Sequence, residues 1–211
     1  MKTAKMMAIV AVLVFGMMFS LGGAAQAGTI NIGDPLVPGA LHVGDTFQLV
    51  FATSTMTNAL SADIATYNTF VQGVAGGGGS LVAHLGVAWK AIGTTPTVTA
   101  PVNAPVSAPV YRVDGVKVAD DYADLWDGTI DNPINKTESG GTPPRGWHPD
   151  ISVWTGHRGT ENLGTTWVGW GVWSATNSLW ITDYRESGDR LAPMYALSEP
   201  ITITEAPGRR A

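Results

Sequence analysis

The sequence contains no cysteine and few charged residues. With no Cys among its 211 residues, the chain has no disulfide framework, no thiolate metal ligand and no cysteine nucleophile. Only 14% of the residues are Asp, Glu, Lys or Arg, which is low for a freely solvated globular protein. We therefore expect packed side chains to supply the stability, and we expect surface that is free to contact other molecules.

The first 27 residues are typical of a secretory signal peptide. Two lysines precede an apolar run from Met6 to Leu21, and Ala25-Gln26-Ala27 fits a cleavage site. The run is short for a membrane span, and no later segment is apolar and long enough to be one. We expect removal of residues 1–27 and a secreted chain, periplasmic or extracellular, that begins at Gly28. An uncleaved N-terminal anchor is the alternative.

The secreted chain is predicted to be an acidic single domain. Removing Lys2 and Lys5 with the leader leaves ten basic side chains against seventeen acidic ones. Nucleic acid is therefore not an expected partner, because proteins bind it mainly through basic side chains. We assign residues 28–45 to an irregular N-terminal arm, 46–205 to one domain and 206–211 to a frayed tail.

Strand and helix patterns alternate along this domain. Runs of apolar and β-branched residues predict strands at 46–53, 87–92, 194–197 and 201–204. The main helix is expected after its N-cap Ser61, with Asp63 in the first turn. It should end at the run Gly76 to Gly79, since consecutive glycines lose too much backbone entropy in a helix. Its buried stripe, at three- and four-residue spacing, is Ile64, Tyr67, Val71 and Val74.

Turn-forming residues dominate the middle of the chain. Four prolines between Thr94 and Pro109 predict an extended surface loop. Asp114-Gly115 lies between two short apolar runs and predicts a two-residue hairpin with a type I′ turn. The segment 121–127 is expected to form a short helical turn closed by Gly128, and 136–150 a long polar loop.

Five of the eight tryptophans lie between Ser152 and Ile181. Each indole can bury a large aromatic area, so this stretch should form short strands packed around the rings and dominate the core. The five are Trp154, Trp167, Trp170, Trp173 and Trp180.

Several short motifs occur in an order that resembles a known fold. Pro109-Val110-Tyr111, Leu125-Trp126-Asp127-Gly128 and Ser152 to Gly156 follow the expected main helix. In this order, residues 63–156 resemble the endostatin-type branch of the C-type-lectin-like fold, the C-terminal module of certain collagens. The resemblance implies an α+β fold of short twisted antiparallel strands, one main helix, one short helix and long loops. The endostatin branch normally carries disulfides, and this chain departs from it there.

The strand from Leu49 to Thr55 is also similar to one in uncharacterised exported bacterial proteins. Many of them end in a Pro-Glu-Pro motif, an apolar helix and an arginine cluster, and a surface-sorting protease recognises this tail. Glu205 to Arg210 lies where this tail would start, but no apolar helix follows, so the resemblance does not imply that sorting route. The calcium-binding triplets of sugar-binding lectins, Glu-Pro-Asn, Gln-Pro-Asp and Trp-Asn-Asp, are absent. Glu199-Pro200 is followed by Ile201, which offers no side-chain oxygen.

Acidic and histidine clusters are candidates for metal or catalytic chemistry. The acidic cluster could bind calcium or hydrolyse glycosides, but its spacing is not that of an EF-hand, and a solvated face with Asp120 or Asp121 capping the helical turn is favoured. His148, Asp150 and His157 could hold zinc, but surface-loop histidines are favoured. We therefore predict no metal and no cofactor. The acidic cluster comprises Asp120, Asp121, Asp124, Asp127 and Asp131.

The candidate ligand-binding residues are aromatic. Odd spacing sends Trp167 and Trp170 to opposite faces of a strand, and likewise Trp170 and Trp173, so at least one ring should be exposed unless loops cover both faces. The interpretation that loops cover every ring is favoured. Exposed indoles stack on sugar rings or anchor protein contacts. Tyr184 and Arg185 complete the candidate set, with Glu186, Asp189 and Arg190 at its rim or solvating a turn.

No catalytic motif accompanies these residues. The sequence has no Gly-x-Ser-x-Gly elbow, no His-Glu-x-x-His pair and no phosphate loop. We predict a secreted, non-catalytic binding or structural domain that contacts an extracellular glycan, matrix polymer or protein through aromatic surface. The alternative is a secreted polysaccharide hydrolase that uses Asp pairs, such as Asp124 and Asp127.

Overall fold

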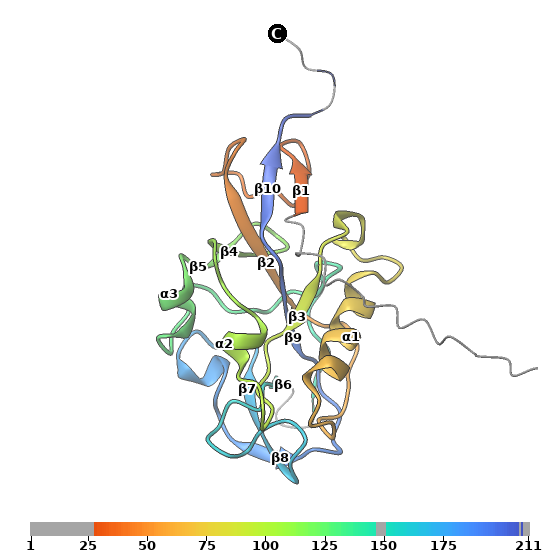
Figure 1. The fold of residues 1–211 in the computed structure, drawn as a ribbon, viewed down its shortest axis with the longest axis vertical. Helices are drawn as coiled ribbons and strands as arrows, with labels where there is room; N and C mark the ends of the chain where they lie inside the picture. The colour runs from red at the N-terminus through yellow and green to blue at the C-terminus, as the bar shows by residue number, and fades with distance from the viewer. Residues whose placement is uncertain (1–27, 147–150, 207, 209–211) are drawn as a thin grey trace, which may run out of the picture.

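The computed structural model describes residues 28–146, 151–206 and 208, which form a mixed α+β fold with curled sheets and three α-helices (Figure 1). The predicted leader, most of the predicted tail, and His148 and Asp150 lie outside these residues. Within the described ranges, no helix has the length and apolar character needed to cross a membrane.

A curled seven-stranded sheet forms the centre of the molecule. Its order is β1-β10-β2-β4-β5, with β9 paired to both β2 and β3. Two pairs, β1 with β10 and β2 with β4, are parallel, so the prediction of antiparallel strands is wrong for them. The strands are β1 (Gly28–Asn31), β2 (Thr46–Ala52), β3 (Trp89–Ala91), β4 (Val110–Arg112), β5 (Lys117–Ala119), β9 (Tyr195–Ser198) and β10 (Ile201–Thr204).

The central strand β2 is buried on both faces. Phe47, Leu49 and Phe51 belong to one core cluster and Val50 to a second, as the two-residue period of a strand requires. Figure 1 shows helix α1 (Ile64–Ala75) on one side of the sheet, and α2 (Ala100–Asn103) and α3 (Tyr122–Trp126) on the other. The predicted strand at 46–53 is thus confirmed as the middle of the core.

The N-terminal segment is not wholly irregular. β1 forms four paired positions with β10, and Ile30 is only 4% exposed. Burial of this side chain explains why the prediction of an irregular arm over 28–45 is wrong at its start. Residues 32–45 form turns and bends without a helix or strand.

Helix α1 confirms the predicted helical spacing but not the predicted cap. Tyr67 and Val71 are buried, while the other two stripe residues are half-buried. Asp63 is the N-cap, since its Oδ1 accepts a hydrogen bond from the backbone N–H of Ala65 at 2.9 Å. Ser61 lies two residues earlier and its Oγ accepts from the Asp63 N–H. The helix ends at Gly76, as predicted.

The proline-rich stretch is packed rather than extended. It contains α2, with a proline in the first turn, where the missing N–H would have had no helical partner. Ala100, the first residue of α2, and Ala104, its C-cap, are completely buried. The side-chain amide of Asn103 donates to Ala91 O at 2.8 Å and, with Asn68 and Gln72 of α1, satisfies the free edge of β3.

The predicted hairpin forms with a longer turn. The Gly115 N–H donates to Arg112 O at 2.9 Å, and Gly115 has a φ of 78°. This is the three-residue loop in which a glycine ends the turn in the left-handed conformation, rather than the predicted two-residue type I′ turn. The helical turn that follows, α3, ends before Gly128, whose φ is 103°. The described part of the predicted loop 136–150 contains no helix or strand.

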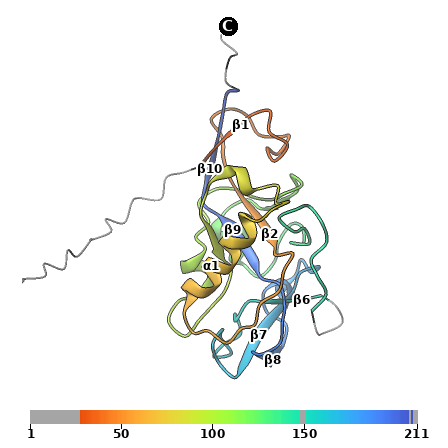
Figure 2. The same ribbon diagram turned by 90° about the vertical axis from the view of Figure 1, so that its right-hand side faces the viewer.

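A second, three-stranded sheet forms the end of the molecule opposite β1 (Figures 1 and 2). Trp154 and Trp180 are fully buried and Trp170 is 2% exposed, so three of the five clustered indoles belong to the core as predicted. The elements are β6 (Ser152–Trp154), β7 (Trp167–Val172), β8 (Arg185–Ser187) and the short 3-10 helix η2 (Ser178–Trp180); a further 3-10 helix, η1 (Ala83–Leu85), precedes β3.

Candidate functional site

Two exposed aromatic rings lie at the β7–β8 end of the molecule. Trp167 is 51% exposed and Tyr184 is 59% exposed. They belong to a continuous set of contacts on the small sheet, which we call the β7–β8 platform and define as Trp167, Arg185, Glu161, Arg158 and Tyr184. Its location is marked by the labels β7 and β8 in Figure 1.

The register of the two strands brings Trp167 and Arg185 together. Trp167 lies opposite Ser187 and Gly169 opposite Arg185, so the two side chains are diagonal neighbours on one face of the sheet. The Arg185 Cζ lies 5.8 Å from the centre of the Trp167 ring. This distance is within the range of a cation–π contact.

One carboxylate connects both halves of the platform. Glu161 accepts a hydrogen bond from Arg185 Nη1 at 2.6 Å and another from Arg158 Nη1. The hydrogen bond from Arg158, together with that from Arg185, holds the pKa of the Glu161 carboxyl below its ordinary value. Arg158 in turn places its Cζ 5.5 Å from the centre of the Tyr184 ring. Each ring thus has a guanidinium against it, and a shared anion fixes both guanidiniums.

Gly169 allows this arrangement, because the loop that carries Arg158 and Glu161 lies directly on β7. The Gly169 N–H donates to Glu161 O at 2.6 Å, and its carbonyl accepts from Gly156 N at 2.8 Å. A Cβ at position 169 would lie 2.7 Å from the Arg158 Cβ. The glycines of the Trp-x-Gly-Trp-Gly sequence therefore admit neighbouring chain segments onto the strand.

The structure brings together three of the five predicted binding residues. Trp167, Tyr184 and Arg185 are in the platform. Because Trp167 is 51% exposed, the favoured interpretation that loops cover every ring is wrong. Trp170 is 2% exposed, so the hypothesis that it binds a ligand is wrong. Its side chain belongs to the core cluster that also contains Phe47 and Leu49. Trp173 follows the end of β7 and is half-buried against the second core cluster.

Sequence reasoning missed Glu161 and Arg158. Their three-residue separation permits an ion pair, but nothing local links them to Arg185, which lies 24 residues beyond Glu161. At the predicted rim, Glu186 Oε1 accepts from the Ser187 N–H at 2.9 Å. That contact is local and does not extend the platform.

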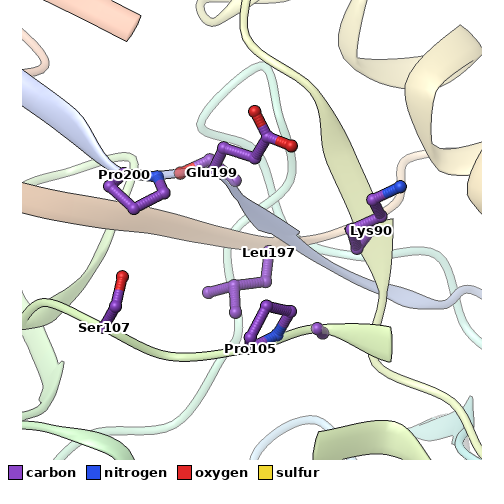
Figure 3. Close-up of a pocket in the computed structure, with 8 residues that line it drawn as sticks. Lys90, Pro105, Ser107, Leu197, Glu199 and Pro200 are labelled. Carbon is purple, nitrogen blue, oxygen red and sulfur yellow. The ribbon is translucent and has the colours of Figure 1, made fainter. Parts of the chain in front are cut away.

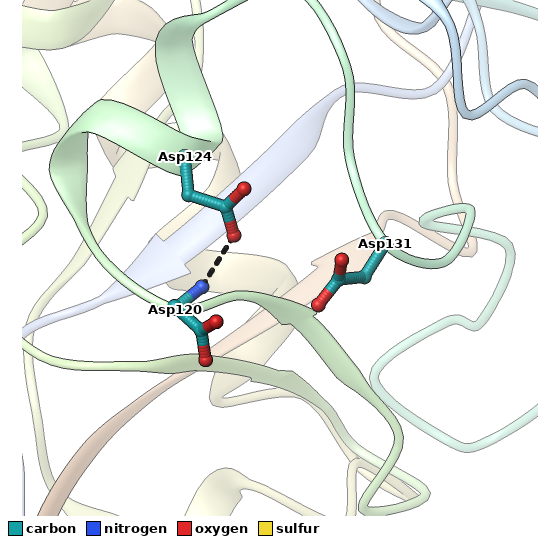
Figure 4. A group of neighbouring side chains, drawn as sticks. All are labelled: Asp120, Asp124 and Asp131. Atoms are coloured by element: carbon teal, nitrogen blue, oxygen red, sulfur yellow. Dashed lines mark hydrogen bonds between the residues drawn. The ribbon is translucent and has the colours of Figure 1, made fainter.

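The acidic cluster is a largely exposed, internally bonded group (Figure 4). Oxygens of Asp120, Asp124 and Asp131 lie within 4.8 Å of one another. Lys117 Nζ lies 2.5 Å from Asp120 and 3.4 Å from Asp131, which raises the pKa of this lysine, mainly through the hydrogen bond from it to Asp120. Asp121 Oδ1 accepts from Asp124 N at 3.0 Å and caps α3, as the favoured interpretation of a solvated capping face predicts.

The carboxylates proposed for hydrolysis are occupied by backbone groups. Asp124 Oδ2 accepts from Asp120 N at 2.6 Å, which Figure 4 shows as a dashed line. Asp127 Oδ1 accepts from the Thr129 N–H and hydroxyl, and these bonds lower the pKa of Asp127. A general acid needs a raised carboxyl pKa, so this residue is tuned in the opposite direction.

His157 is half-buried, contrary to the expectation of a surface-loop histidine. Its Nδ1 lies 3.2 Å from Thr94 Oγ1, and its ring centre lies 6.2 Å from that of Trp126. Burial lowers the pKa of the imidazole and favours its neutral form. The other proposed zinc ligands, His148 and Asp150, lie outside the described residues.

A small cavity lies beside β9, between α2 and the turn that precedes β10 (Figure 3). Its volume is about 80 Å³. Such a space holds a few water molecules and is well below the usual size of a ligand pocket. Its walls include Lys90, Pro105, Ser107, Leu197, Glu199 and Pro200.

No protein-family model matches the chain, and searches of the curated proteins and of the solved structures found no match. The chemistry of the sites is therefore the guide to function. In the β7–β8 platform, exposed aromatic surface and fixed charged groups occur together.

Proposed function

We propose that this protein is a secreted, non-catalytic domain that binds an extracellular polymer, either a glycan or a matrix protein, through the β7–β8 platform. The observation that carries the proposal is the fixation of two exposed rings, Trp167 and Tyr184, by guanidiniums that share Glu161. Side chains that are ordered before a ligand arrives lose less conformational entropy on binding.

The composition of the platform also supports binding. Trp, Tyr and Arg are the residue types that contribute most to binding energy at interfaces. Exposed ion pairs contribute little to folding stability, so stability alone does not account for a network of two arginines and a carboxylate around exposed rings. A binding surface accounts for both the exposure and the order.

The proposed fold is an endostatin-type, C-type-lectin-like domain. It is supported by the order of elements along the chain, because α1 is followed by the β4–β5 hairpin, α3 and β6, and these elements carry the motifs that resemble that family. The absence of cysteine and the parallel strand pairs are departures from the expected pattern. Secretion is supported by the charged, apolar and Ala-x-Ala parts of residues 1–27.

The hydrolase alternative has no comparable support. Both Asp residues named for it, Asp124 and Asp127, accept hydrogen bonds from backbone N–H groups. A glycosidase needs two carboxyl groups on either side of the scissile bond, one of them with a raised pKa.

The test compares retention of the purified protein on immobilised polysaccharides and on matrix proteins such as gelatin. Trp167→Ala should weaken retention on the bound polymer about tenfold, the effect of removing one aromatic anchor. Tyr122→Ala is the matched control, because Tyr122 is 50% exposed but lies on α3. Equal retention of both variants, or release of soluble fragments from the polymer, would contradict the proposal.

A further inference from the structure

A further cavity lies between α3 and η2 and shares no residue with the β7–β8 platform. Its volume is about 150 Å³, and its walls include Leu125 and Trp126 of α3 and Ser178 and Trp180 of η2. Because Ser178 is exposed, the cavity reaches the surface of the molecule. An engineered cavity of about this size in another protein holds one benzene molecule. A molecule with a single ring therefore fits.

The walls of this cavity are largely aromatic. The centre of the Trp126 ring lies 5.9 Å from that of Trp180 and 6.2 Å from that of His157, which also lines the cavity. Aromatic rings attract one another at such separations. Leu125 and Ile181 add buried aliphatic surface. An aromatic ring in the cavity would therefore extend a cluster of rings that is already formed.

The polar groups of the walls are short of acceptors. The indole Nε1–H groups of Trp126 and Trp180 are buried and have no acceptor among the described residues. Native proteins rarely leave buried donors in this state, because such groups have lost their hydrogen bonds to water without replacement. A ligand that brings an acceptor to this region is therefore favoured over one that brings further donors.

His157 supplies another donor in its neutral form. Thr94 Oγ1 accepts a hydrogen bond from the Ala100 N–H at 3.0 Å, so its own proton is available to His157 Nδ1 at 3.2 Å. With Nδ1 as the acceptor, the proton of a neutral imidazole is on Nε2, which is then a donor. Burial lowers the pKa of His157 and favours this neutral form.

From these features we infer that the cavity binds a small neutral molecule with one aromatic ring and one acceptor oxygen. The ring packs against Trp126 and Trp180, and the oxygen accepts a hydrogen bond from His157 Nε2. This site is separate from the platform, so the inference goes beyond the proposed function.

The lining also disfavours other ligands of similar size. Among the described residues that line the cavity, none is Asp, Glu, Lys or Arg, so a charged ligand would lose its hydration without gaining an opposite charge. A sugar ring fits the volume, but each of its hydroxyl groups is a donor that needs an acceptor of its own.

Calorimetric titration with four small molecules tests the ligand class. Acetophenone, which has one ring and one acceptor oxygen, should bind about fivefold more tightly than toluene, which has the ring alone, because one hydrogen bond is added. Benzoate, which is charged, and glucose should each bind more weakly than toluene. In NMR spectra, acetophenone should shift the indole N–H signals of Trp126 and Trp180 and leave that of the exposed Trp167 unchanged.

Variants test the location of the site. Ser178→Leu places a larger apolar side chain in the wall and should weaken acetophenone binding about tenfold. Ser174→Leu is the matched control, because Ser174 is exposed and outside the lining. His157→Phe keeps a ring but removes the donor, so the affinity ratio of acetophenone to toluene should fall from about fivefold to about one. A purely structural role of His157 would leave this ratio unchanged.

Four results would overturn the inference. They are no heat and no signal change with acetophenone, which would mean that the cavity holds water only; equal affinity for acetophenone and glucose; equal affinity of the Ser178→Leu and Ser174→Leu variants; and a signal change confined to Trp167. The proposed function is tested separately, because Ser178→Leu should leave polymer retention unchanged and Trp167→Ala should leave acetophenone binding unchanged.

Discussion

Replacing Gly169 by alanine should damage the platform without replacing any of its five side chains. The new Cβ would lie 2.7 Å from Arg158 Cβ, 3.2 Å from Arg158 N and 3.3 Å from Glu161 O. Two of these neighbours are backbone atoms, and the third is joined directly to the backbone. The loop must therefore move away from β7, and with it the two residues that hold both aromatic rings.

The size of the effect follows from this overlap. Adding a methyl group to a fully packed site costs about 1–3 kcal/mol. A central value of about 2 kcal/mol corresponds to a fall of about 4–8 °C in melting temperature for a domain of this size. The stability loss is moderate, so the variant should still fold at room temperature while the loop is displaced.

Gly73→Ala is the matched control. Gly73 lies in α1, and a Cβ there would meet nothing within 4 Å. Alanine in a helix is more stable than glycine by about 0.5–1 kcal/mol, so this variant should melt at a slightly higher temperature and bind normally. The same chemical change is thus expected to have opposite effects at the two positions.

Calorimetric melting and polymer retention measure both consequences. Gly169→Ala should lower the melting temperature and weaken retention, whereas Gly73→Ala should do neither. A Gly169→Ala protein that is as stable as the parent and keeps full retention would refute the role assigned to the loop on β7.

Four further predictions concern charge and capping. Glu161→Gln should weaken polymer binding severalfold but change the free energy of unfolding by less than about 1 kcal/mol, because exposed ion pairs add little stability; full binding by calorimetry would contradict this. Burial lowers the pKa of His157 below its ordinary value of 6.5, so as the pH falls the unfolded chain is protonated at this position before the folded one. The free energy of unfolding, measured in urea, should therefore fall as the pH drops below about 6.5, and His157→Asn should lack this fall. The carboxyl pKa values of Glu161 and Asp127 are lowered, so their contribution to stability should be complete above the ordinary carboxyl pKa and should be lost as the pH falls through that value and then through the lowered one, which urea titrations at a series of pH values would measure. Asp121→Ala should destabilise the protein by about 1 kcal/mol in urea titrations through loss of the α3 cap, and an unchanged midpoint would rule that role out.

Local patterns in the sequence were sufficient for several elements. The almost continuous apolar run of β2 and the helical spacing around Tyr67 reflect burial within one element, and the glycine at position 76 marks the end of α1. The hairpin at Asp114-Gly115 and the turn before Gly128 depend on glycines at positions with positive φ. Such features are readable because the deciding side chains are close together in the chain.

Longer-range choices were not readable in this way. β1 is a strand because it pairs with β10, more than 170 residues away, and the proline-rich stretch contains α2 because Ala100 and Ala104 are buried in the second core cluster. The choice between Ser61 and Asp63 as cap depended on where the chain enters α1. In each case the outcome depended on a partner that the local sequence does not specify.

The sequence by itself determined that indoles in the Trp167–Trp173 segment would face opposite sides, since a strand alternates its side chains. Only the tertiary structure decided which side is covered: Trp170 is in the core, and Trp167 is in solvent beside Arg185. It also brought Glu161 and Arg158 to the same place, because Gly169 leaves room for their loop on β7. Alternation is a property of one strand, whereas a shared carboxylate between two arginines requires segments distant in the chain to fold against each other.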